Sequence, residues 1–135
     1  MAELALTREG VVHFLHRFDE LALKEDFGLI QDMIHAQAVF RLHDGDHVGR
    51  AAIRELMEKS WQSSSGLKRE RFYLSEIQVP TVDEESASAT FTYNWVGSMG
   101  PQLFSLQGRG TRVVVVVDGR MQIVHEHLSH LPQPQ

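Results

Sequence analysis

The sequence has no cysteine among its 135 residues. Disulfide bonds, thiolate nucleophiles and zinc sites with thiolate ligands are therefore excluded. Basic residues are fewer than acidic ones: the chain has 13 lysines and arginines and 18 aspartates and glutamates, which gives a net charge of -5. Such a chain offers no general basic field for nucleic acid. Its one basic cluster, Lys68-Arg69-Glu70-Arg71, is short and interrupted by a glutamate, and we interpret it as a solvated strand entry rather than a phosphate site.

Long apolar runs are also absent. No stretch approaches the ~20 apolar residues of a membrane span, and the N-terminus lacks the basic and apolar regions of a signal peptide. We therefore expect no membrane association and a cytoplasmic location. A chain of 135 residues suits one domain with one core, and we expect a single domain over residues 1–135. Residues 130–135 are expected to fray, because the prolines of this tail cannot continue a strand.

The first part of the sequence reads as helical. Apolar residues recur at helical spacing over residues 7–24, where the first residue, a threonine, is a good N-cap. The same spacing predicts a short second helix over residues 27–35 and a third over residues 49–62. Between them, residues 38–42 are expected to be extended and residues 43–46 to form a turn.

The rest of the sequence predicts an antiparallel sheet. A strand is expected over residues 69–79, stopped by Pro80, and residues 87–95 alternate strictly between apolar and polar side chains. Two further strands, residues 104–117 and 120–129, form a closing hairpin. Helices followed by strands predict an α+β fold, in which a curved antiparallel sheet wraps around the N-terminal helices.

The closing hairpin is the most informative segment. Asp118-Gly119 is a strong signal for a two-residue loop with a type I′ turn, and such a loop sets the register. Counting outward from the loop places Arg112 opposite His125 and Gly110 opposite His127. One face of the hairpin is then apolar near the turn and carries three nitrogen bases at its far end.

Two motifs resemble the nuclear transport factor 2-like superfamily, in particular its SnoaL-like proteins and the association domain of calcium/calmodulin-dependent kinase II. One motif is the segment from His43 to Ile53, which leads into the third helix. The other combines Thr111-Arg112-Val113, the Asp-Gly turn and the segment from Val124 to Ser129. The resemblance implies a cone-shaped α+β fold with a cavity between helices and sheet. It also implies dimerisation through the outer face of the sheet. Because this superfamily contains isomerases, dehydratases, cyclases, hydrolases and non-catalytic domains, the fold alone sets no chemistry.

Arg112 is the leading ligand-binding candidate. It matches the cavity-facing arginine of the kinase association domain, and a buried guanidinium needs an anionic partner. That partner is either a carboxylate of the chain or the carboxylate or phosphate of a ligand. The carboxylates considered within the chain are Asp19, Glu20, Asp44 and Asp46.

Proton transfer is assigned to His125 or Asp44, and His127 joins the ligand-binding set. Asp44 also fits a plain role as a turn former at a helix entry. Trp95 and Tyr93 share a strand face and are expected to shape an apolar wall. We expect no metal, because a cation between His125 and His127 would be repelled by Arg112. Ser129 lacks the glycine elbow of a serine nucleophile.

These observations predict a homodimeric domain that binds a small, partly apolar, anionic molecule and needs no cofactor. If the protein is an enzyme, cofactor-free acid/base chemistry is expected: isomerisation, dehydration or cyclisation. The alternative is a non-catalytic assembly domain whose sheet matters more than its cavity.

Overall fold

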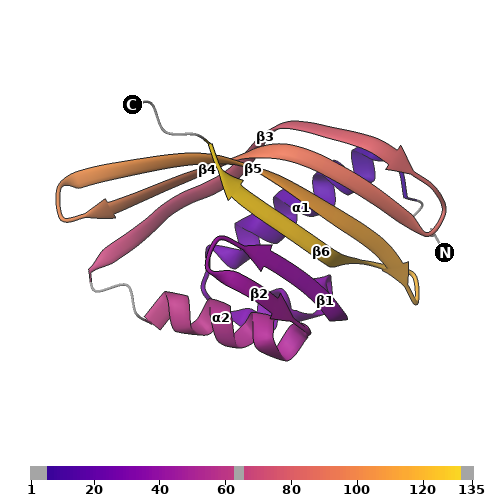
Figure 1. Ribbon diagram of the computed structural model, residues 1–135, viewed down its shortest axis with the longest axis horizontal. Coiled ribbons are helices and arrows are strands. Elements are labelled where there is room, and N and C mark those ends of the chain that lie inside the picture. Colours follow the sequence, from indigo (N-terminus) through magenta and orange to yellow (C-terminus); the bar gives the residue numbers. More distant parts are fainter. Residues whose placement is uncertain (1–5, 63–65, 132–135) are drawn as a thin grey trace.

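The computed structural model describes residues 6–62 and 66–131. Its first helix, α1 (Arg8–Ala22), begins where it is predicted, because the Thr7 hydroxyl accepts a hydrogen bond from the Gly10 backbone N–H at 2.9 Å. Val11, Leu15 and Phe18 follow one another at helical spacing and are buried. The helix therefore packs an apolar stripe onto the concave face of the sheet (Figure 1).

The predicted second helix is wrong. Two short 3₁₀ turns, η1 (Phe27–Leu29) and η2 (Gln31–Met33), occupy most of this stretch, and strand β1 (Ile34–Leu42) follows directly. Short apolar runs do not distinguish a helix from a strand, and here pairing with the last strand of the chain decides the outcome. The predicted third helix is confirmed as α2 (Arg50–Gln62).

Six strands form one sheet in the order β2-β1-β6-β5-β4-β3 (Figure 1). All neighbours pair antiparallel except β1 and β6, which are parallel. The remaining strands are β2 (Gly45–Val48), β3 (Leu67–Val82), β4 (Ser86–Met99), β5 (Gln102–Val117) and β6 (Arg120–His130). The α+β class with a curved, mostly antiparallel sheet is as predicted.

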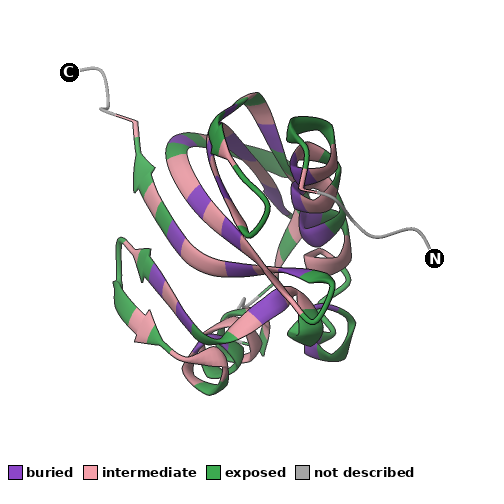
Figure 2. Ribbon diagram, turned by 90° about the vertical axis from the view of Figure 1, so that its right-hand side faces the viewer, coloured by how far each residue is buried: buried purple, intermediate pink, exposed green. Residues whose placement is uncertain are grey.

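Strand β3 continues past Pro80, where the sequence predicts a stop. The strand lies at the edge of the sheet and pairs with β4 alone, and its register shifts between Gln78 and Thr81. A proline at such an irregular edge position removes no obligatory ladder hydrogen bond. Along the strands, buried residues alternate with intermediate and exposed ones (Figure 2).

The closing hairpin keeps its predicted register only near the turn. Asp118 and Gly119 have φ of 51° and 77°, as a type I′ turn requires, and pairing from Val117–Arg120 to Val114–Ile123 is as predicted. The register then shifts, because Val124 is an extra residue that forms a β-bulge.

Beyond the bulge, Arg112 pairs with Glu126, and Val113 pairs with His125. The prediction that Arg112 faces His125, and Gly110 faces His127, is therefore wrong. Successive residues of a strand point to opposite faces, so Arg112 and His125 lie on opposite sides of the sheet. Strand β6 is also paired with β1, where Val39 lies beside His125 and the pairing is irregular just before it. The bulge therefore lies where β6 pairs with two strands, and a count along the hairpin alone takes no account of the second strand.

His130 is the last residue of β6. Residues 132–135 of the predicted tail, and residues 63–65 between α2 and β3, lie outside the described residues. Within the described part, no helix is long and apolar enough to cross a membrane.

Candidate functional site

A buried charged centre connects α1 to the middle of the sheet. Arg112 of β5 is 2% exposed, Asp19 of α1 is 4% exposed and Glu126 of β6 is 5% exposed. The Arg112 guanidinium donates Nη2 to Asp19 Oδ1 at 2.9 Å and Nη1 to Asp19 Oδ2 at 3.2 Å. Its Nε donates to Glu126 Oε1 at 2.7 Å. Two carboxylates from different elements therefore neutralise one guanidinium and accept three hydrogen bonds from it.

The centre carries one excess negative charge when both carboxylates are ionised. Burial raises the pKa of Asp19 above its ordinary value; Arg112 counteracts this shift in part, and the nearby Glu126 carboxylate adds to it. The pKa of Arg112 is raised by its two carboxylate partners, which outweigh the effect of its burial. We therefore treat Arg112 as charged, and Asp19 as a carboxyl group that burial disposes toward its protonated form.

Aromatic rings enclose the guanidinium. The Phe18 and Phe91 ring centroids lie 5.1 Å and 5.2 Å from Arg112 Cζ. Such stacking stabilises a desolvated cation and leaves it little freedom to move. Arg112 is thus both electrostatically satisfied and sterically held by the chain's own residues.

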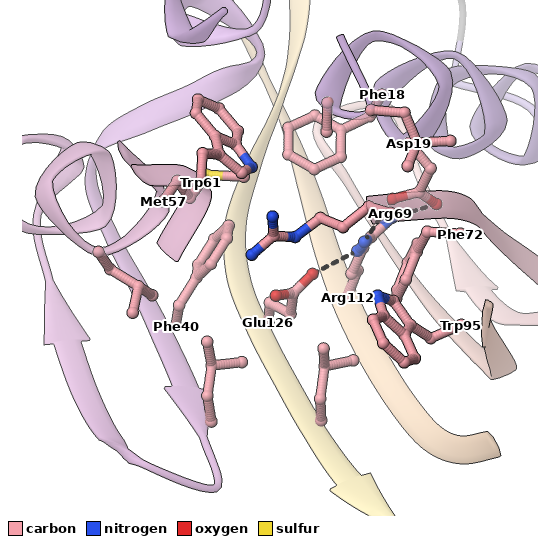
Figure 3. A pocket seen from close by; sticks show the side chains of 15 residues that line it. Phe18, Asp19, Phe40, Met57, Trp61, Arg69, Phe72, Trp95, Arg112 and Glu126 are labelled. Atoms are coloured by element: carbon pink, nitrogen blue, oxygen red, sulfur yellow. Dashed lines mark hydrogen bonds and ion pairs between the residues drawn. The ribbon is translucent and has the colours of Figure 1, made fainter. Parts of the chain in front are cut away.

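A pocket of about 180 Å³ opens beside this centre, between α1, α2 and the concave face of the sheet (Figure 3). Its charged lining residues are Asp19, Glu126, Arg112 and Arg69. The rest of the lining is apolar: Phe18, Ala22, Leu23, Phe40, Leu42, Leu56, Met57, Trp61, Phe72, Trp95 and Leu128. Arg112 donates a hydrogen bond to Oε1 of Glu126. The other carboxylate oxygen, Oε2, is turned away from Arg112 toward the pocket (Figure 3). The site can therefore present a carboxylate oxygen to an apolar molecule.

Arg69 of β3 crosses the outer part of the pocket, and its side chain is 17% exposed. Its Nη2 donates to the Ser60 carbonyl at 2.7 Å and to the Ser60 hydroxyl at 2.8 Å, near the end of α2. Its Nη1 donates to Glu25 Oε2 at 3.4 Å, just beyond the end of α1. Arg69 therefore has specific partners and a pocket position, in contrast to the solvated strand entry that the sequence predicts.

The structure places Arg112 and Trp95 in the lining of the same pocket, and their ligand-binding role stays a prediction. Tyr93 lies one step further along the same strand face and is buried. Its ring stacks on Phe72 at 5.7 Å, and its hydroxyl is 2.9 Å from Nδ1 of His130. Burial raises the pKa of Tyr93. Tyr93 thus supports the pocket wall through Phe72.

The three other predicted site residues lie elsewhere. His125 is half-buried on the opposite face of the sheet, and His127 is exposed on that face in a shallow groove with Thr111 and Arg109. Asp44 is exposed in the turn before β2, where its Oδ1 is 3.2 Å from His47 Nε2. The structure does not bring these residues to Arg112, and their chemical roles stay predictions.

The bulge also changes which side chains lie on the outer face of the hairpin. A hairpin without it would place Glu126 on that face near Arg109, but the bulge turns Glu126 inward to Arg112. Arg109 instead pairs with Ser129 across the strands. Val113, Val115 and Val124 remain on the outer side and are half-buried.

Asp19 could be predicted from the sequence as a partner of Arg112, whereas Glu126 could not. Asp19 lies four residues after Leu15 and eight after Val11, so it interrupts an apolar helical stripe with a carboxylate, which is a signal for a buried partner. It is among the partners considered for Arg112. Glu126 becomes a partner only through the bulge, for which the sequence carries no local marker.

Comparison with known proteins agrees with this architecture. Residues 11–134 match the family of the SnoaL-like domain. No curated protein matches the chain.

Among solved structures, Aln2 from a Streptomyces species has a TM-score of 0.80 at 19% identity, covering 93% of this chain and 94% of Aln2. A protein from Catenulispora acidiphila in complex with S-DNPA has a TM-score of 0.77 at 18% identity, covering 89% of this chain and 90% of that one. A nuclear transport factor 2-like superfamily protein from Salmonella enterica serovar Typhimurium has a TM-score of 0.76 at 17% identity, covering 94% of this chain and 92% of that one.

These likenesses establish the fold, and the family match spans nearly the whole chain. The chain therefore belongs to the SnoaL-like domain family, with a nuclear transport factor 2-like fold.

Proposed function

We propose that this domain binds a small, partly apolar molecule in the pocket beside Arg112. The observation that carries the proposal is the contrast within that pocket, where an apolar wall ends at a buried carboxyl–guanidinium–carboxyl centre. Ligand sites commonly combine an apolar lining with a few convergent polar groups. The complex of the Catenulispora protein with S-DNPA is a precedent for a bound small molecule on this fold.

The volume of the pocket and the charges of its buried centre restrict the class of ligand. A pocket of about 180 Å³ is smaller than the roughly 300–1,000 Å³ of drug-sized sites, so a one- or two-ring molecule is expected. The charge of Arg112 is already neutralised by Asp19 and Glu126, so an anion placed there would compete with two carboxylates. We therefore assign to the buried end a hydroxyl or another proton-donating group, in place of the anion that the sequence predicts at Arg112.

If a reaction takes place, Glu126 is the group we propose to move the proton. Its Oε2 faces the pocket, Arg112 holds the carboxylate through Oε1, and Asp19 shares the guanidinium. This is the arrangement that cofactor-free acid/base chemistry needs, with a positioned carboxylate beside an apolar wall. Isomerisation, dehydration and cyclisation remain the proposed reaction classes.

Tryptophan fluorescence tests the binding proposal directly, because both tryptophans of the chain, Trp61 and Trp95, line the pocket. A suitable probe is 3-(4-hydroxyphenyl)propan-1-ol, which has one ring, a phenolic hydroxyl at one end and an alcohol at the other. We expect a saturable fluorescence change with the wild-type protein. Ala22→Phe should abolish it by filling the pocket, whereas Ala51→Phe, at an exposed position of α2, should leave it unchanged. Equal binding by both variants would place the probe elsewhere.

A second variant tests the role of Glu126. Glu126→Gln keeps the shape and removes the charged acceptor, and hydrogen bonds to charged groups contribute about 1.5–3 kcal/mol. The affinity for the hydroxyphenyl probe should therefore fall about tenfold or more relative to that for 3-phenylpropan-1-ol, which lacks the ring hydroxyl. An equal change for the two probes would remove Glu126 from the site.

The second candidate function is assembly as a homodimer through the outer face of the sheet. The observation that favours it is the row of half-buried valines, Val113, Val115 and Val124, bordered by polar residues such as Thr111 and Gln122. Light scattering at micromolar concentration should give twice the monomer mass. Val113→Asp should lower that mass toward the monomer, and a monomeric wild-type protein would contradict the proposal.

A further inference from the structure

We infer that Arg69 is the anion contact of this pocket and that the ligand is an amphipathic carboxylate. In this arrangement the apolar body of the ligand lies among the aromatic side chains, and its carboxylate meets Arg69 at the outer end. The inference rests on the proposed binding function and names the ligand class for that same site.

The two arginines of the pocket differ in how fully carboxylates of the chain neutralise their charges. Arg112 makes three charge-assisted hydrogen bonds to two carboxylates that are almost completely buried. Among the described residues, Arg69 has one carboxylate partner, Glu25, at 3.4 Å through Nη1. Its other contacts, through Nη2, go to the neutral carbonyl and hydroxyl of Ser60. The charge of Arg69 is therefore much less completely neutralised than that of Arg112.

The Glu25 contact is weak enough for a ligand to replace it. The Glu25 side chain is 38% exposed, and exposed ion pairs contribute roughly 0–1 kcal/mol. Arg69 is 17% exposed, so its charge is screened less than that of a surface arginine. A guanidinium has five N–H donors, two of them on Nη1. A ligand carboxylate can therefore accept from Nη1 in place of Glu25 while Nη2 stays on Ser60.

The space around Arg69 suits such a ligand. A second hollow of about 580 Å³ adjoins the pocket and shares the side chains of Leu42, Leu56, Met57, Trp61 and Phe72 with it. Ser60, the partner of Arg69, also lines this hollow, together with Lys59, His43 and Asp44. A molecule can thus extend outward from the buried centre past Arg69. Of the charged groups at this end, Lys59 favours an anion, and Glu25 and Asp44 oppose it.

A matched pair of probes separates the anion contact from binding in general. One probe is 3-(4-hydroxyphenyl)propan-1-ol, and the other is 3-(4-hydroxyphenyl)propionate, which carries a carboxylate in place of the terminal alcohol. Both are titrated into the full chain by calorimetry at pH 7 and low salt. We expect the acid to bind at least about fivefold more tightly than the alcohol, and added salt to reduce this ratio.

Three variants test the assignment to Arg69. Arg69→Gln should weaken binding of the acid about tenfold and change binding of the alcohol less than twofold. Glu25→Gln should strengthen binding of the acid a few-fold, because the competing carboxylate is removed, and leave the alcohol unchanged. Lys68→Gln is the control, because Lys68 neighbours Arg69 on β3, is 76% exposed and lines neither the pocket nor the second hollow; it should change the ratio less than twofold.

The outcomes separate the two proposals. If neither probe binds the wild-type protein at millimolar concentration, the pocket does not accept one-ring molecules, and both proposals fall. If the alcohol binds and the acid binds no more tightly, the inference about Arg69 is overturned and the proposed function stands. If Arg69→Gln weakens both probes equally, Arg69 only supports the pocket wall, and the inference is again overturned.

Discussion

Replacing Arg112 with methionine removes the cation of the buried centre while keeping an unbranched apolar side chain among the Phe18 and Phe91 rings. Asp19 and Glu126 then stay buried, at 4% and 5% exposure, without their shared guanidinium. The change tests whether the centre is electrostatically coupled as its geometry indicates.

The expected loss of stability follows from the two carboxylates that stay buried without Arg112. Removing one partner of a buried ion pair costs about 3–5 kcal/mol, because the remaining charge is uncompensated. Two carboxylates are left here, and each can escape the cost by taking up a proton. The folded variant therefore holds more protons than the wild-type protein, and the loss of stability grows with pH by up to about 1.4 kcal/mol per pH unit for each carboxyl group.

Urea unfolding at pH 5 and pH 8 measures this loss. We expect Arg112→Met to lose about 3–5 kcal/mol at pH 8 and at least about 1 kcal/mol less at pH 5. The triple variant Asp19→Leu, Arg112→Met, Glu126→Met replaces all three charges with apolar groups. Its stability should lie within about 2 kcal/mol of the wild-type value and show none of the added pH dependence.

Arg120→Met is the matched control. Arg120 lies on the same hairpin, but its side chain is 71% exposed and its contact with Asp32 is 3.8 Å long. It should change stability by less than about 0.5 kcal/mol. If Arg112→Met costs no more than this control, or if its cost is the same at both pH values, the coupling of Arg112 to the two buried carboxylates is refuted.

Three further predictions concern single positions. Because burial raises the pKa of Asp19, its protonated form adds stability that is fully present below its ordinary pKa and lost as pH rises through the folded pKa. Asp19→Asn should therefore gain stability relative to wild type as pH rises above the ordinary aspartate value, and a difference in unfolding free energy that stays constant with pH in urea unfolding would contradict this. Gly110→Ala should cost about 1–3 kcal/mol in thermal or urea unfolding, because a Cβ there would overlap the Phe91 ring and lie 2.6 Å from Leu128 Cδ2; an unchanged midpoint would show that the strand pair relaxes freely. Thr7→Ala should cost about 1 kcal/mol and fray the start of α1 in amide exchange, whereas Thr7→Ser should cost little, because it keeps the capping hydroxyl.

Much of the fold follows from local patterns in the sequence. The helical spacing of Val11, Leu15 and Phe18, with Thr7 as N-cap, determines α1, and strict alternation determines β4. The Asp118-Gly119 loop determines the closing turn and the first four residue pairs beyond it. These signals are local, since each depends on residues within a few positions of one another, and they are sufficient for the α+β class.

The stretch after α1 shows where local patterns fail. Residues 27–35 carry an apolar pattern that fits a short helix, and the structure uses them for two 3₁₀ turns and the start of β1. The choice is made by β6, which lies far away in the sequence and offers Ile34 a parallel partner in Ile123. Such pairing energy is not visible in the segment itself.

The pocket chemistry depended on the tertiary structure in the same way. Arg112 and Trp95 could be assigned from the sequence, because a strand arginine needs a partner and an alternating strand has one apolar face. Whether His125 or Glu126 joined them depended on a single extra residue, Val124, whose bulge arises where β6 pairs with both β5 and β1. The sequence determined that Arg112 would be buried with a counter-charge. Only the packing of α1, β5 and β6 against one another decided that two carboxylates of the chain supply it, because their distances are set by contacts among residues far apart in the chain.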